Sequence, residues 1–154
     1  MKPPTPFLWF NSNAEEAANF YVSVFKNSKM GAVSRYPHDT PGAKKGDVMV
    51  VKFCISGQEF TALNGGPAFK FNEAVSFVVE CDNQAEIDEY WKKLTADGGK
   101  PGVCGWLKDK FGLSWQIVPA HLGKLLTGKN GAQTAAALMK MTRLNIAELE
   151  TAAG

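Results

Sequence analysis

The feature that most constrains the fold of this chain is an internal duplication with a spacing of 70 positions. In both copies an apolar run leads into a short polar turn and then into an amphipathic stretch. Three pairs of residues correspond at this spacing: Phe7 with Phe77, Asn13 with Asn83, and Glu16 with Glu86. An asparagine followed three positions later by a glutamate is typical of a helix start, because each side chain can bond the other's backbone N–H. Each copy therefore predicts a strand, a turn and a helix.

Extended segments follow each predicted helix. The first copy has them at 31–36, 47–56 and 59–63, and the second at 102–106, 108–110 and 113–118. Each copy is thus a β-α-β-β-β module, and one helix can cover only one face of such a sheet. The sequence predicts an α+β fold in which two tandem βαβββ modules form cupped, mostly antiparallel sheets, followed by C-terminal helices.

The predicted organisation is a single domain of 154 residues. Module one covers about 5–68, module two about 72–119, and a C-terminal helical extension covers 120–154. Within the extension we expect helices at 121–127 and 132–143, and a last turn that begins at Asn145. The second of these helices is rich in alanine and methionine, which favours a subunit contact. We therefore expect a homodimer.

Composition and charge exclude several classes of protein. A net charge of +2 with scattered lysines is too weak to favour nucleic acid. No apolar run approaches the roughly 20 residues that span a bilayer, so we expect no membrane partner. The proline-rich start lacks the apolar stretch of a secretory signal, and three cysteines at wide spacing form no disulfide framework. These features predict a cytoplasmic protein.

Few residues suggest a catalytic centre. The two histidines, His38 and His121, have no nearby nucleophile motif, so a surface position is favoured for both. Cys104 precedes a glycine and a tryptophan, and Lys108 follows closely. A neighbouring lysine lowers the pKa of a thiol, which makes Cys104 a candidate nucleophile. The alternative, a small residue packed in a strand, stays open.

Four segments of the chain, 5–10, 60–67, 71–76 and 104–119, resemble a known family. They are similar to the PhnB-like group, often labelled as a 3-demethylubiquinone-9 3-methyltransferase domain. This group belongs to the vicinal oxygen chelate superfamily, with glyoxalase I, bleomycin-resistance proteins and extradiol dioxygenases. The resemblance covers nearly the whole chain and implies paired βαβββ modules around a cup.

The resemblance also implies where a metal site would lie. Metalloenzymes of the superfamily place a histidine on the first strand and a glutamate on the last strand of each module. The matching positions here fall near Pro6 or Phe7, near Ala62 or Asn64, near Val75 or Ser76, and at Gln116. None of these is an imidazole or a carboxylate, so we expect no bound metal and no cofactor. A metal-dependent lyase, isomerase or dioxygenase remains the alternative.

A methyltransferase, as the family label suggests, is the less favoured alternative. Such enzymes bind their nucleoside cofactor at a strand, a glycine-rich loop and a helix. Here Gly65 and Gly66 are followed by Pro67 and by no helical pattern.

The favoured hypothesis is a protein that binds a small organic molecule in an aromatic-lined cup. Aromatic side chains on a concave surface suit a flat or apolar ligand, and a few polar groups orient it. The predicted lining residues are Trp9, Asn64, Ser76, Cys104, Trp106 and Gln116. Whether a reaction follows binding stays open.

Overall fold

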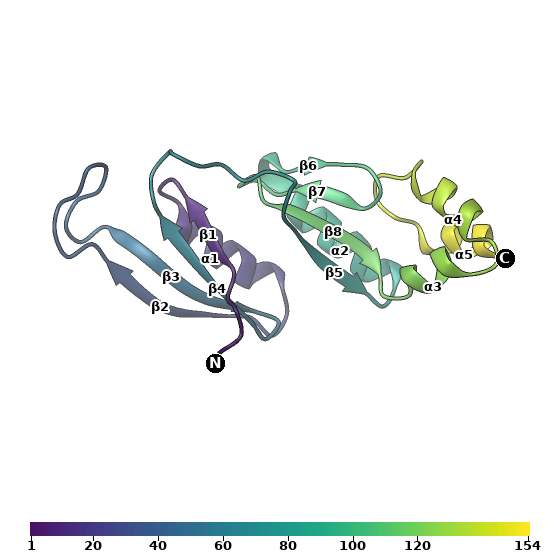
Figure 1. Ribbon diagram of the computed structural model, residues 1–154, viewed down its shortest axis with the longest axis horizontal. Coiled ribbons are helices and arrows are strands. Elements are labelled where there is room, and N and C mark those ends of the chain that lie inside the picture. Colours follow the sequence, from purple (N-terminus) through teal and green to yellow (C-terminus); the bar gives the residue numbers. More distant parts are fainter. The chain divides into compact units, whose positions relative to one another are not determined.

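The computed structural model describes all 154 residues. The chain forms two compact units, Met1–Phe71 and Asn72–Gly154, and each is described by itself (Figure 1).

Unit 1 is a four-stranded sheet with one helix. Its elements are β1 (Phe7–Phe10), α1 (Ala14–Val24), β2 (Lys29–Arg35), β3 (Val48–Ile55) and β4 (Gln58–Asn64). The strand order is β1-β4-β3-β2, in which β1 and β4 run parallel and the other neighbours run antiparallel.

Unit 2 repeats this arrangement and adds three helices. The repeated part contains β5 (Ser76–Cys81), α2 (Gln84–Thr95), the 3-10 turn η1 (Ala96–Gly98), β6 (Lys100–Pro101), β7 (Trp106–Lys108) and β8 (Ser114–Pro119). The order β5-β8-β7-β6, with β5 parallel to β8, is the same as in unit 1. The extension holds α3 (Leu122–Thr127), α4 (Gly131–Leu138) and α5 (Ile146–Ala153). The predicted α+β fold of two tandem βαβββ modules is therefore confirmed.

Some boundaries differ from those that the sequence predicts, and the short strand expected at 108–110 lies at Trp106–Lys108, as β7. The segment 102–106 was expected to be a strand, but β6 ends at Pro101 and β7 begins at Trp106. The chain turns between them, with positive φ at Cys104 (57°) and Gly105 (81°), a conformation that no regular strand contains. The helix expected over 132–143 ends at Leu138.

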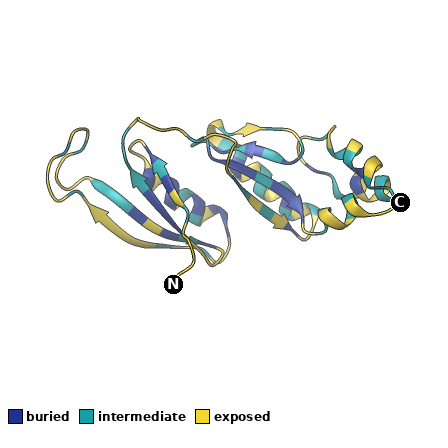
Figure 2. Ribbon diagram, in the orientation of Figure 1, coloured by how far each residue is buried: buried dark blue, intermediate teal, exposed yellow.

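In each unit the helix covers one face of the sheet (Figure 2). Tyr21 of α1 is fully buried and stacks on Phe53 of β3, with ring centroids 6.1 Å apart. In unit 2, Ile87 and Leu94 of α2 are fully buried on the side of Trp115 and Ile117 of β8. Each fully buried side chain of this size stabilises the fold by about 1.5–3 kcal/mol, so these faces anchor the two units.

The helix starts do not behave alike, although their sequences match. Asn83 accepts a hydrogen bond from the N–H of Glu86 at 3.0 Å, and the Glu86 carboxylate accepts one from the N–H of Asp82 at 2.9 Å. Asn13 makes no such bond, so its predicted capping role is wrong. The N–H of Ala14 donates instead to the Asn64 side chain at 2.8 Å. A residue at the end of β4 thus replaces the local cap.

This difference predicts unequal effects of the same substitution. Asn83→Ala removes the capping hydrogen bond from the N–H of Glu86 and should lower the free energy of unfolding by about 1 kcal/mol. Asn13→Ala removes none and should change it by less than about 0.5 kcal/mol. Urea unfolding of both variants checks this, and equal losses would contradict the assignment.

None of the helices combines the length and the apolar character that crossing a bilayer demands.

Candidate ligand-binding site

The face of the second sheet that α2 does not cover carries a row of polar and aromatic side chains. Residues paired across neighbouring strands point to the same face of a sheet. Ser76 pairs with Ser114, Lys108 also pairs with Ser114, and Trp106 pairs with Gln116. These five residues therefore share one face, which we call the open face of unit 2. Three of the predicted ligand-binding residues, Ser76, Trp106 and Gln116, are among them.

A hollow of about 550 Å³ lies at this face. Its lining residues are Glu73, Lys100, Pro101, Gly102, Val103, Cys104, Trp106, Leu107, Lys108 and Ser114. It is large enough for a small organic molecule. Two of the predicted lining residues, Cys104 and Trp106, belong to it. Hollows of about 370 and 440 Å³ lie in unit 1.

Ser114 distinguishes the hollow of unit 2 from those of unit 1. The residue is only 1% exposed, and its hydroxyl has no hydrogen-bond partner in the protein. Leaving a buried hydroxyl unpaired costs about 1–3 kcal/mol, which is why buried polar groups nearly always have partners. A group entering the hollow could supply the missing bond.

Charges of both signs border the hollow. Lys108 forms an ion pair with Glu73. The hydrogen bond from Lys108, together with that residue's positive charge, holds the pKa of the Glu73 carboxyl below its ordinary value of 4.5. Lys100 lies directly opposite Lys108 across the β6–β7 pair. Two cations and one anion leave this border with a net positive charge.

Ser76 and Gln116 are joined by a hydrogen bond. The Gln116 amide nitrogen donates to the Ser76 hydroxyl at 2.9 Å, and both side chains are partly exposed. The structure therefore brings together this predicted pair on the same face as Trp106.

The two predicted residues of unit 1 do not share a face. Trp9 pairs with Leu63, whereas Asn64 pairs with Phe10, which is buried. The Trp9 indole packs edge-on against Phe69 at 4.9 Å and donates to the Gly66 carbonyl at 2.9 Å. Trp9 and Asn64 therefore point to opposite faces of the first sheet, because neighbours along a strand alternate between the two faces.

Asn64 lines the hollow of about 440 Å³ in unit 1, and both ends of its side-chain amide make structural hydrogen bonds. Its carbonyl oxygen accepts from the N–H of Ala14 at 2.8 Å, and its amide nitrogen donates to the Val48 carbonyl at 3.0 Å. Its own backbone carbonyl accepts from the Tyr36 hydroxyl at 2.6 Å. The residue therefore ties the start of α1 to the sheet.

The three cysteines have different environments. Cys81 is fully buried on β5, and burial raises the pKa of its thiol to about 12, with the carboxylates of Glu86 and Asp82 adding to the shift. Cys54 and Cys104 are partly exposed. Cys104 lies in the turn that lines the hollow, so the alternative of a residue packed in a strand does not apply to it.

Within either unit, no three side chains of His, Cys, Asp or Glu come together as a metal site would require. His121 lies 3.1 Å from the Glu150 carboxylate in the extension. At the four positions that match the superfamily's metal ligands, the oxygen-bearing side chains are neutral, and Asn64 and Gln116 already make hydrogen bonds. These residues do not fit a divalent catalytic ion well.

Sequence reasoning missed Ser114, Glu73 and Lys100. The alternation along β8 carries a signal for Ser114, because a serine two positions before Gln116 must share its face. Glu73 and Lys100 reach the hollow only through tertiary structure, and no local pattern marks them.

Solved structures of low sequence identity share the fold of this protein. PA1353 from Pseudomonas aeruginosa has a TM-score of 0.61 at 21% identity, covering 77% of this chain and 98% of its own. The fosfomycin resistance protein FosX from Listeria monocytogenes, solved with Mn(II) and sulfate, has a TM-score of 0.51 at 14% identity, covering 77% and 89%. These structures show that the fold is the one implied by the resemblance to the vicinal oxygen chelate superfamily.

The family follows from sequence. The family described as 3-demethylubiquinone-9 3-methyltransferase matches residues 3–118. The PhnB protein from Bacillus cereus is 37% identical, with a TM-score of 0.68, and the match covers 76% of this chain and 99% of that one. No curated protein matches. The chain belongs to this PhnB-like family.

The cysteine environments predict selective labelling. At pH 8 a maleimide should modify Cys54 and Cys104 and leave Cys81 unmodified, because a thiol with a pKa of about 12 supplies almost no thiolate. Since the folded thiol holds its proton more tightly than the unfolded one (ordinary pKa 9.0), its contribution to stability is complete below pH 9 and is lost as the pH rises toward 12. Peptide mass spectrometry checks the pattern, and rapid labelling of Cys81 would contradict it.

Proposed function

We propose that this protein binds a small organic molecule in the hollow on the open face of unit 2. The unpaired Ser114 hydroxyl is the observation that carries this proposal, because it lines a hollow of suitable size yet finds no partner in the protein. Trp106 supplies an aromatic surface there, and Cys104 a polarizable one. The predicted residues Ser76 and Gln116 extend the same face.

The charges favour a ligand that carries an anionic group. Lys100 and Lys108 lie directly opposite each other, and like charges in that position repel. Glu73 neutralises only one of them. A carboxylate or similar anion would relieve the repulsion and could accept a hydrogen bond from Ser114, which is a charge-assisted bond.

We propose that the site binds its ligand without a metal ion. The positions that match the superfamily's metal ligands offer only neutral oxygens, and those of Asn64 and Gln116 belong to side chains that already make hydrogen bonds. A methyltransferase stays disfavoured, because no helix begins between Pro67 and α2, which starts at Gln84.

We also propose a homodimer in the cytoplasm, with the open sheet faces as the contact. The sequence favoured the alanine- and methionine-rich helix for this role. In the structure, however, Leu138 and Met141 at its end pack on Leu144 and Leu149 inside unit 2. Exposed apolar residues also lie on the open faces, with Phe7 60% and Val78 54% exposed, while Met139 of the extension is 72% exposed.

Ser114→Ala tests the proposed binding site. Removing an unpaired buried hydroxyl should leave the stability unchanged or raise it by up to about 1 kcal/mol, whereas loss of a ligand hydrogen bond should weaken binding about tenfold. The probe is the anionic fluorophore anilinonaphthalene sulfonate, with urea unfolding measured in parallel. Ser34→Ala, an exposed strand serine in unit 1, is the control. Unchanged binding would overturn the proposal.

Lys100→Gln tests the preference for an anion. It should weaken binding of the sulfonate probe about tenfold. Binding of the uncharged analogue N-phenylnaphthylamine should not change, because only the sulfonate interacts with the charge of Lys100. Lys92→Gln on the exposed side of α2 is the charge-matched control. Equal weakening of both probes would show that Lys100 acts through packing and not through charge.

The dimer is tested by one substitution on each surface. Native mass spectrometry should give twice the chain mass of 16.7 kDa. Val78→Lys should release monomer by placing a charge in an apolar contact, whereas Met139→Lys, 72% exposed on the extension, should not. Monomer released by Met139→Lys and not by Val78→Lys would show that the extension forms the dimer contact.

A further inference from the structure

The C-terminal extension lies outside the part of the chain that the family shares. The family match ends at residue 118, and the PhnB protein from Bacillus cereus covers only 76% of this chain. The extension contributes no residue to the lining of the hollow. It nevertheless contacts the turn that contains Cys104 and Gly105, and Cys104 lines the hollow.

Backbone hydrogen bonds attach this turn to the extension. The N–H of Cys104 donates to the Met141 carbonyl and the N–H of Gly105 to the Thr142 carbonyl, both at 2.8 Å. On its other side, the Gly105 carbonyl accepts from the N–H of Ile117 at 2.8 Å. The turn is therefore held between β8 and the segment 141–144.

The backbone of the turn needs such support. Cys104 has a φ of 57°, which is unfavourable for a residue with a side chain and persists only where the surroundings enforce it. Gly105 has a φ of 81°, and a Cβ there would lie 2.8 Å from the Ile117 carbonyl oxygen and 3.1 Å from the Leu144 side chain. The turn thus packs closely on Leu144.

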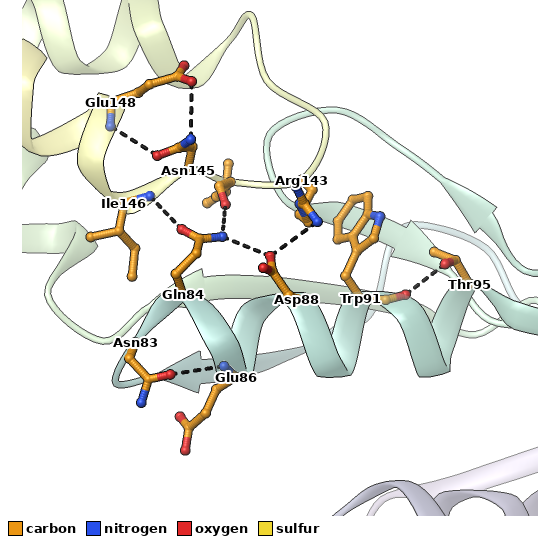
Figure 3. A network of polar contacts seen from close by, with 11 residues as sticks. Asn83, Gln84, Glu86, Asp88, Trp91, Thr95, Arg143, Asn145, Ile146 and Glu148 are labelled. Atoms are coloured by element: carbon orange, nitrogen blue, oxygen red, sulfur yellow. Dashed lines mark hydrogen bonds and ion pairs between the residues drawn. The ribbon is translucent and has the colours of Figure 1, made fainter.

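Gln84 binds the main chain of the extension on both sides of Asn145 (Figure 3). Its amide nitrogen donates to the Leu144 carbonyl at 3.0 Å, and its amide oxygen accepts from the N–H of Ile146 at 2.9 Å. The same nitrogen lies 3.0 Å from the Asp88 carboxylate, which also pairs with Arg143 at 3.2 Å. One side chain of α2 therefore binds the main chain of the extension twice.

We propose that Gln84 is a positioning residue for the hollow. It acts through the segment 141–146, which in turn holds the Cys104–Gly105 turn and with it the wall of the hollow. By linkage, occupancy of the hollow and docking of the extension stabilise each other. The positioning of the turn follows from the hydrogen bonds of Gln84 and of the turn itself, whereas the effect on a ligand rests on the proposed function.

Thiol labelling of Gln84→Ala tests the positioning directly. Loss of two hydrogen bonds from the main chain of the extension should release the turn and speed maleimide labelling of Cys104 about tenfold. Cys81 reports on opening of the rest of unit 2 and Cys54 on unit 1, and both should keep their rates. Gln133→Ala, an exposed glutamine on α4, is the control and should change none of the rates.

Two results would overturn the proposal. One is a Cys104 rate within about twofold of the wild type, and the other is equal acceleration of Cys104 and Cys81, which would show that unit 2 unfolds as a whole. Arg143→Ala is a milder variant, since its side chain is 52% exposed, and it should accelerate Cys104 by a smaller factor. It keeps the test decisive if Gln84→Ala does not fold.

Binding of anilinonaphthalene sulfonate separates this proposal from the proposed function. The wild type should bind the probe, and Gln84→Ala should bind it several-fold more weakly while retaining its fold by circular dichroism. If the wild type does not bind the probe, the function fails and the labelling result still decides the role of Gln84. If the wild type binds and Gln84→Ala binds equally well, the link between the turn and the ligand is wrong.

Discussion

The constraint on which the rest of the structure depends is that each four-stranded sheet has two faces and only one helix to cover them. In unit 1, α1 buries Tyr21 against β3, and in unit 2, α2 buries Ile87 and Leu94. The opposite faces keep apolar residues exposed, Phe7 on one sheet and Val78 on the other. The open faces are therefore the surfaces available for binding, because the side chains of the covered faces are buried against α1 and α2.

The open face of unit 2 differs from an ordinary apolar surface in its polar groups. Ser114 is buried without a partner, and Lys100 faces Lys108. Both features are unfavourable, and the anionic ligand of the proposed function would remove both. The extension supports the wall of the hollow through backbone hydrogen bonds and adds no lining residue.

Much of the fold could be predicted from sequence because the duplication repeats both composition and spacing. Matching residues such as Phe7 and Phe77 lie in the equivalent strands β1 and β5, in sheets of identical order. The failures arose where distant residues override local patterns. Asn13 was expected to cap α1, but Asn64 bonds the N–H of Ala14 instead, from 50 positions further along the chain. A buried hydroxyl without a hydrogen-bond partner, such as that of Ser114, can be recognised only from the assembled sheet.

A crystal structure of the protein purified from its own host tests the central claim most directly. The account predicts a non-protein molecule in the hollow of unit 2, with an anionic oxygen about 2.7 Å from the Ser114 hydroxyl oxygen and its apolar part against Trp106. A hollow filled by protein side chains, with the Ser114 hydroxyl bonded to one of them, would contradict it.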